Sequence, residues 1–165
     1  MKKCLGIIAI LSVFIVAACA GVGTSPKGLE APIEKASISM VIDVKAGGYK
    51  LVDAEELNKW LIEKKDLLLI DTNPQQVYDK AHIKGAVSRT IPRIETELKP
   101  ADKENILKVA GPDKEKTIVV YCGFTACQRS HWGAKFLIEG GFTNVYRFPG
   151  GIIGWKEYGF PIEGK

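Results

Sequence analysis

Two cysteines in one short segment are the residues best suited to chemistry in this chain. Cys122 and Cys127 flank the residues GFTA, and Cys122 follows directly after the apolar run IVVY at 118–121. A continuous apolar run of this length is typical of a strand buried on both faces of a parallel sheet. Ligands of open parallel sheets bind beyond the carboxyl ends of the strands. We therefore interpret Cys122 as the candidate catalytic nucleophile.

The residues after Cys122 favour an anion-binding loop. Successive backbone N–H groups of such a loop can turn inward, and a helix that begins near residue 128 adds the partial positive charge of its N-terminus. Arg129 adds a full charge in the first turn, and Ser130 can donate a hydroxyl to the sulfur. These features predict an anionic substrate and a Cys122 pKa below the ordinary thiol value. The predicted substrate-binding residues are Gly123, Phe124, Thr125, Ala126, Cys127, Gln128 and Arg129.

Other kinds of site find little support in the residue pattern. Cys-x4-Cys without a second ligand pair does not predict zinc, and no other group of His, Cys, Asp and Glu has metal-ligand spacing. Gly150-Gly151 lacks the Lys-Ser/Thr of a phosphate-binding loop and is interpreted as a turn close to the cysteines. We expect His82 to make a structural hydrogen bond and His131 to lie on the surface. The sequence thus implies no metal and no cofactor.

The elements that must position Cys122 alternate between strand and helix. Asp53, Asn73 and Asp102 have the residue type and context of helix caps. Alternation of this kind predicts an α/β fold with a mostly parallel central sheet flanked by helices on both faces. Strands are expected at 38–42, 49–51, 67–70, 86–91, 118–121 and 144–147, and helices at 53–64, 74–80, 102–110, 128–139 and 152–158.

The N-terminal segment is predicted to export and anchor the chain. Met1-Lys2-Lys3 precedes the uncharged residues 4–18, which fit a signal peptide and are shorter than the ~20 residues of a membrane-spanning helix. The ending VAAC at 16–19 resembles the bacterial lipoprotein cleavage box, whose Cys becomes the lipid-bearing first residue. An ordinary signal peptide cut near Ala18 or Ala20 is the alternative.

This interpretation divides the chain into three parts. They are a signal peptide at 1–18, the lipidated Cys19 with a flexible tether at 19–37, and a single domain at 38–165. The expected location is the bacterial cell envelope, on the periplasmic face of a membrane that the N-terminal lipid enters. Free thiol pairs tend to oxidise in such a compartment.

Composition excludes several classes of protein. The chain is 46% hydrophobic and 25% charged, which suits a packed core and argues against wholesale disorder. Its 23 Lys and Arg exceed its 19 Asp and Glu by only +4, without a dense basic run, so nucleic acid is not an expected partner. Two of the four cysteines, Cys4 and Cys19, lie in the N-terminal segment, which excludes a disulfide-stapled small domain.

Ordered motifs across residues 45–163 resemble the rhodanese domain. The resemblance implies a rhodanese-like fold and a sulfurtransferase that carries sulfane sulfur as a persulfide on Cys122. It also implies a small sulfur-containing anion as donor and a thiol, free or on a protein partner, as acceptor. The motifs are DTN at 71–73 with Tyr78, AHIKGA at 81–86, VVYC at 119–122, FPGGI at 148–152, Gly154-Trp155 and Gly159-Phe160-Pro161.

The spacing within the loop leaves other functions open. The family's usual Arg lies five residues after the Cys, where this chain has Cys127, and Arg129 lies seven after Cys122. Cell-cycle dual-specificity phosphatases share the fold but need Cys-x5-Arg, so phosphatase activity is not expected. Cys127 could form a disulfide with Cys122 or resolve its persulfide, as in a thiol–disulfide or chalcogen redox module. A catalytically silent rhodanese-type binding module is the third alternative, with exposed Phe124 as a contact.

Overall fold

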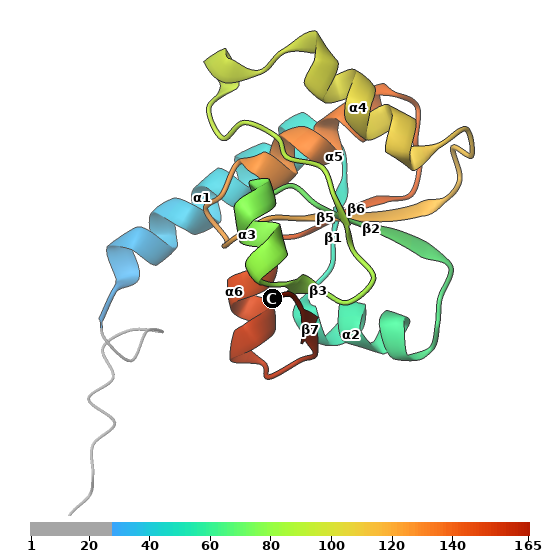
Figure 1. The fold of residues 1–165 in the computed structure, drawn as a ribbon. Coiled ribbons are helices and arrows are strands. Elements are labelled where there is room, and N and C mark those ends of the chain that lie inside the picture. The colour runs from blue at the N-terminus through green and yellow to red at the C-terminus, as the bar shows by residue number, and fades with distance from the viewer. Residues whose placement is uncertain (1–27) are drawn as a thin grey trace, which may run out of the picture.

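Helices and strands alternate along the chain, as Figure 1 shows. The computed structural model describes residues 28–165, so the predicted signal peptide, Cys19 and the tether up to residue 27 lie outside the described residues. Among residues 28–165, no helix combines the length and apolar character needed to cross a membrane. The elements in chain order are α1 (Glu30–Gly47), β1 (Lys50–Leu51), α2 (Ala54–Ile62), β2 (Leu67–Asp71), α3 (Gln75–Lys80), β3 (His82–Ile83), β4 (Val87–Ser88), the 3-10 turn η1 (Glu95–Glu97), α4 (Pro100–Ala110), β5 (Thr117–Tyr121), α5 (Arg129–Glu139), β6 (Val145–Phe148), α6 (Gly151–Glu157) and β7 (Ile162–Glu163).

A five-stranded parallel sheet forms the centre of the fold. Its strand order is β1-β6-β5-β2-β4, and every neighbouring pair is parallel. β5 therefore lies in the middle, with β2 and β6 beside it. Parallel neighbours require crossover connections, and the helices between the strands supply them. The predicted α/β class with a mostly parallel sheet is confirmed. β3 and β7 form a separate antiparallel pair that the sequence analysis did not predict.

Helices cover both faces of the sheet, as predicted (Figure 1). One buried cluster joins Ile118 and Val120 of β5 to residues of α4 and α5, with Val44 of α1 packed against it. The other cluster joins Val119 and Tyr121 of β5 to residues of α2 and α6. Alternate side chains of β5 thus enter opposite cores, which is the physical reason that the whole run is apolar.

The structure corrects the expectation for residues 38–42. They belong to α1, which begins at Glu30 inside the range expected to be a tether, and they are not a strand. Their alternating apolar residues fit a strand pattern, but α1 buries a helical set instead: Met40, Asp43, Val44 and Gly47 are at least partly buried. Ile38 and Ile42, which define the alternation, are 54% and 59% exposed.

Of the three residues predicted to be helix N-caps, one is an N-cap and two are not. Asp53 caps α2, because its side chain accepts the backbone N–H of Glu56 at 2.8 Å. Asn73 does not cap α3, whose N-cap is Pro74 without a side-chain hydrogen bond. Asp102 lies inside the first turn of α4, where it accepts the backbone N–H of the N-cap residue Lys99. Asp102 therefore supplies one half of a capping box, because the Lys99 ammonium group cannot accept the return hydrogen bond.

Candidate active site

The cysteine loop, residues 122–128, lies at the carboxyl edge of the parallel sheet. It begins directly after β5 and ends where α5 starts at Arg129. Cys122 and Cys127 are both free thiols, only 1% and 3% exposed. The loop tip between them, residues 124–126, is exposed. The strand end therefore presents two buried thiols within one loop.

Ser130, at the start of α5, holds the sulfur of Cys122. Cys122 Sγ lies 3.1 Å from Ser130 Oγ, and the Ser130 backbone N–H also donates to the sulfur. Because Ser130 Oγ accepts a hydrogen bond from Arg147 Nε at 3.0 Å, its own hydrogen is free to point at the sulfur. The N-terminus of α5 thus supplies two donors to Cys122, in line with the expected anion-binding role of that helix end.

The two thiols have opposite pKa shifts, which differs from the expectation that the Cys122 pKa is lowered. Burial raises the pKa of Cys122 well above the ordinary thiol value, and the neighbouring Cys127 raises it further. The hydrogen bond from Cys122, aided by the backbone N–H groups of Arg129 and Gly123, lowers the pKa of Cys127 to about 5. The surroundings of the pair therefore favour negative charge on Cys127, with Cys122 as the thiol that donates to it.

Arg147 of β6 is the cation that holds the cysteine loop, and the sequence analysis missed it. Its side chain is fully buried. Its Nη2 donates to the carbonyl oxygens of Cys127 at 2.9 Å and Thr125 at 3.5 Å. The only signal in the sequence is an arginine within the predicted strand 144–147, next to the strand that leads to Cys122. A buried charge of this kind requires a partner.

Asp43 of α1 is that partner, and it completes a buried polar network. Asp43 Oδ2 lies 3.0 Å from Arg147 Nη1 and also accepts from Gln128 Nε2 at 2.9 Å. Tyr49 OH accepts from the same Nη1 at 3.1 Å, so its hydrogen points to His131 Nδ1, 2.8 Å away. His131 is therefore buried rather than on the surface as expected, and burial lowers its pKa.

Arg129 acts on Cys127 more directly than on Cys122. Its Nη1 donates to the backbone carbonyl of Ile91, which fixes the guanidinium outside the loop. Its backbone N–H donates to the Cys127 sulfur, and its charge helps to lower the Cys127 pKa. The structure thus brings Arg129 into the site through its backbone and its field. No hydrogen bond joins its guanidinium to either sulfur among the described residues.

The remaining predicted loop residues form the rim of the site. Phe124 is 44% exposed, as expected, and Arg93 lies 5.8 Å from its ring centroid. The Gly123 carbonyl accepts the Ile153 backbone N–H at 3.0 Å, which joins the loop to α6. Gly151 begins α6 beside the loop, so the Gly-Gly turn lies where the sequence analysis expected it.

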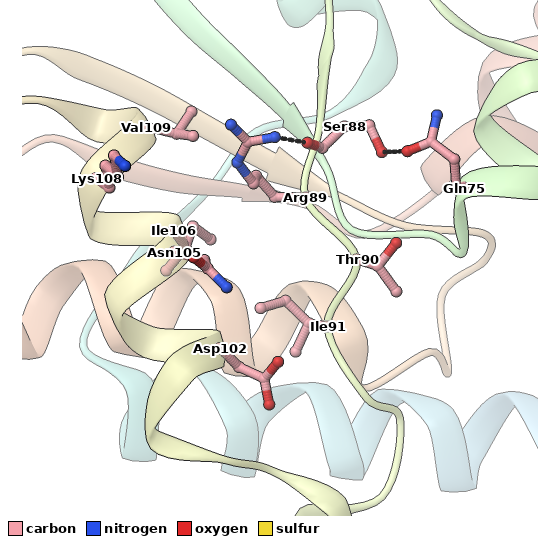
Figure 2. A pocket seen from close by; sticks show the side chains of 10 residues that line it. All are labelled: Gln75, Ser88, Arg89, Thr90, Ile91, Asp102, Asn105, Ile106, Lys108 and Val109. Carbon is pink, nitrogen blue, oxygen red and sulfur yellow. Dashed lines mark hydrogen bonds between the residues drawn. The ribbon is translucent and has the colours of Figure 1, made fainter.

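Two concavities lined in part by charged residues lie near this edge of the sheet. The first, about 370 Å³, lies between α1 and the cysteine loop and is lined by Lys35, Arg93 and Thr125 among others. The second, about 660 Å³, lies between residues 88–91 and α4, and Figure 2 shows its polar side chains. Neither cysteine lines either pocket, but Thr125, Ala126 and Gln128 of the cysteine loop line the first, so the first is the one adjacent to the thiols.

The end of β2 adds a buried carboxyl group beside the loop. Burial raises the pKa of Asp71 to about 6, although its Oδ1 accepts the Asn73 backbone N–H at 2.7 Å. Asn73 Oδ1 lies beside Gly123, close to where a side chain at that glycine would sit. His82 makes the expected structural hydrogen bond, to the Tyr78 carbonyl at 2.8 Å. Within the described residues, no group of three His, Cys, Asp or Glu side chains could hold a metal ion.

Comparison with known proteins gives a consistent result. Residues 53–158 match the family model of the rhodanese-like domain. The chain is 30% identical over 103 residues to the thiosulfate sulfurtransferase GlpE of Coxiella burnetii, covering 62% of this chain and 84% of that protein. It is 31% identical over 113 residues to the tRNA uridine(34) hydroxylase of Bordetella parapertussis, covering 68% of this chain but only 44% of that protein. The solution structure of the polysulfide-sulfur transferase homodimer of Wolinella succinogenes has a TM-score of 0.56 at 27% identity, covering 80% of this chain and 92% of that chain.

Proposed function

Because the chain belongs to the rhodanese-like domain family, we propose that it is a sulfurtransferase whose Cys122 carries sulfane sulfur as a persulfide. The observation that carries this proposal is the position of the Cys122 sulfur. It follows the central strand and meets two donors from Ser130, the hydroxyl at 3.1 Å and the backbone N–H. Donors at that place stabilise negative charge on the sulfur during attack and on the persulfide that results.

The loading step uses the two cysteines together. Cys122 passes its proton to the Cys127 thiolate as its sulfur attacks the outer sulfur of an anionic donor such as thiosulfate. The sulfur–sulfur bond of the donor breaks, sulfite leaves with the bonding electron pair, and Cys122 keeps one extra sulfur as a persulfide anion. Cys127 can take the proton because its sulfur is hydrogen-bonded to Cys122, and the donors from Ser130 stabilise the charge left on the Cys122 sulfur.

The groove between α1 and the cysteine loop is the proposed path for the donor. Lys35 and Arg93 line it and supply positive charge for an anion. Cys122 is only 1% exposed, so the exposed tip at 124–126 must move aside before the donor reaches the sulfur. The acceptor that takes the sulfur is proposed to be a thiol, free or on a protein partner, that approaches along the same path.

The release of sulfite tests this proposal at its first step. The full chain, reduced and freed of small thiols under anaerobic conditions, is mixed with thiosulfate. We expect a burst of about one sulfite per chain. Cleavage after Lys116 and Arg129 isolates a peptide with both loop cysteines and neither Cys4 nor Cys19, and its mass shows whether the loop retains an added sulfur.

Two variants assign the roles of the cysteines. Cys122→Ser is expected to give neither the sulfite burst nor the added sulfur. Cys127→Ser is expected to load more slowly, since the base is gone, and to end with one extra sulfur atom on the 117–129 peptide. Absence of any burst in the unmodified chain, or sulfur bound in Cys122→Ser, would refute Cys122 as the carrier.

Anchoring of the chain in the cell envelope is a separate part of the proposal. It is supported by the sequence alone, through the basic start, the uncharged residues 4–18 and the VAAC ending at 16–19. The test is the mass of the mature N-terminal peptide and the distribution of the protein between membrane and soluble fractions. A lipidated Cys19 that disappears in Cys19→Ser, with release of the protein from membranes, is the expected result. A mature chain that begins elsewhere would refute the anchor.

A further inference from the structure

We propose that Cys127 is a resolving thiol, which attacks the Cys122 persulfide and expels the carried sulfur as sulfide. The loop then closes into a Cys122–Cys127 disulfide. This inference rests on the proposed persulfide at Cys122. It adds a second activity to sulfur transfer: the reduction of sulfane sulfur to sulfide at the expense of two thiols in the same loop.

The geometry of the loop brings the two sulfur atoms together. Cys122 and Cys127 side chains are hydrogen-bonded to each other, and Cys122 Sγ lies 3.4 Å from the backbone carbonyl oxygen of Cys127. The Cys127 backbone is held on both sides, because its N–H donates to the Phe124 carbonyl and its own carbonyl accepts from Arg147, each at 2.9 Å. The resolving sulfur is therefore fixed next to the atom that it must attack.

The reaction balances without a further oxidant. The persulfide anion on Cys122 takes the proton of the Cys127 thiol on its outer sulfur. The Cys127 sulfur attacks the inner sulfur, Cys122 Sγ, and a sulfur–sulfur bond forms between the cysteines. The bond to the outer sulfur breaks, and that sulfur leaves with the electron pair as hydrosulfide. The sulfane sulfur gains two electrons, and the two cysteine sulfurs together lose them.

Burial favours this internal reaction over attack by an external thiol. Both cysteine residues are less than 4% exposed, so an external acceptor must displace the loop tip before it reaches the persulfide. Cys127 is already in place, and an internal partner on a short loop acts at an effective concentration on the order of millimolar or above. Release of sulfide therefore needs no thiol in solution.

The disulfide that results is expected to be readily reduced. It closes a loop of only four intervening residues, so it gains little from restricting the unfolded chain. A dithiol reductant restores both thiols by thiol–disulfide exchange, which returns the loop to its reduced form with two free thiols. The proposed cycle therefore consumes one sulfane sulfur and one external dithiol, and it yields one sulfide.

The test is the production of sulfide in the absence of any external thiol. The full chain is reduced, desalted under anaerobic conditions and mixed with thiosulfate, and sulfite and sulfide are both measured. We expect about one sulfide for each sulfite in the unmodified chain. After thiol blocking and cleavage, the 117–129 peptide should be lighter than the dithiol form by two hydrogens. A sample without thiosulfate should keep both thiols.

The Cys127 variants separate this inference from the proposed function. In Cys127→Ser and in Cys127→Ala, we expect sulfite and a stable added sulfur, with sulfide below a tenth of that from the unmodified chain until a thiol is added. An unmodified chain that keeps the extra sulfur and yields sulfite without sulfide would refute the resolving role and leave the carrier role intact. No sulfite from any of these proteins would refute the carrier role itself.

Discussion

Replacement of Arg147 by methionine tests how the cysteine loop is held in place. The substitution keeps a long side chain in the buried position but removes every hydrogen bond of the guanidinium. Arg147 bonds Ser130 at 3.0 Å, Asp43 at 3.0 Å, Tyr49 at 3.1 Å and the Cys127 carbonyl at 2.9 Å. The change therefore leaves a carboxylate and a loop carbonyl without their cation.

The expected loss of stability follows from the burial of the ion pair. The side chain of Arg147 is 0% exposed and that of Asp43 is 13% exposed. Removal of one partner from a buried pair costs about 3–5 kcal/mol. Asp43 keeps the hydrogen bond from Gln128 and some contact with water, so we expect about 3 kcal/mol. For a domain of this size, that corresponds to a melting temperature lower by roughly 6–12 °C.

Urea denaturation of the full chain measures this change against a matched control. Lys103→Met removes an ion pair to Glu139 whose side chains are 38% and 39% exposed, and it should cost about 0–1 kcal/mol. A double-mutant cycle with Asp43→Asn should give a coupling energy of about 1–3 kcal/mol for the buried pair. If Arg147→Met costs no more than Lys103→Met, the idea that Arg147 holds the loop is wrong.

Three further substitutions test the neighbouring residues. Ser130→Ala removes a donor to Cys122 and should slow the sulfite burst about tenfold, measured by rapid mixing. Asp71 has a pKa raised by burial to about 6 in the folded state, so folding binds a proton and stability falls as the pH rises from about 4 through 6. In Asp71→Asn, the free energy of unfolding should fall by about 3 kcal/mol less across this pH range than in the unmodified chain, as measured by denaturation curves. Gly151→Ala should destabilise the protein by about 2 kcal/mol or more, because its φ is +60° and a Cβ would meet the Cys122 carbonyl oxygen and lie 2.7 Å from the Gly123 carbonyl carbon. Gly154→Ala, in the same helix with nothing within 4 Å, should not reduce stability; equal losses in both variants would refute the clash.

Much of the fold could be predicted because its central strands are encoded locally. The runs at 67–70 and 118–121 are apolar at every position, which suits strands with a core on each side. The predicted strand at 38–42 was wrong because the spacing of its apolar residues fits a short strand as well as part of a helix. The choice between the two depends on what packs against these residues. Asp43 and Val44 of α1 meet Arg147 and the core beside α5, and neither contact can be seen in the local sequence.

The candidate site divides in the same way. The sequence alone determined that a cysteine follows the central strand, that a second cysteine lies five residues beyond it, and that a helix with Ser130 comes next. Only the tertiary structure decided which thiol is ionised, because that depends on which backbone N–H groups and charges surround each buried sulfur. It also brought Arg147 and Asp43, far apart along the chain, beneath one loop. The order of residues along the chain determines which reactive groups lie in the loop. Burial and long-range packing determine which of those groups is charged.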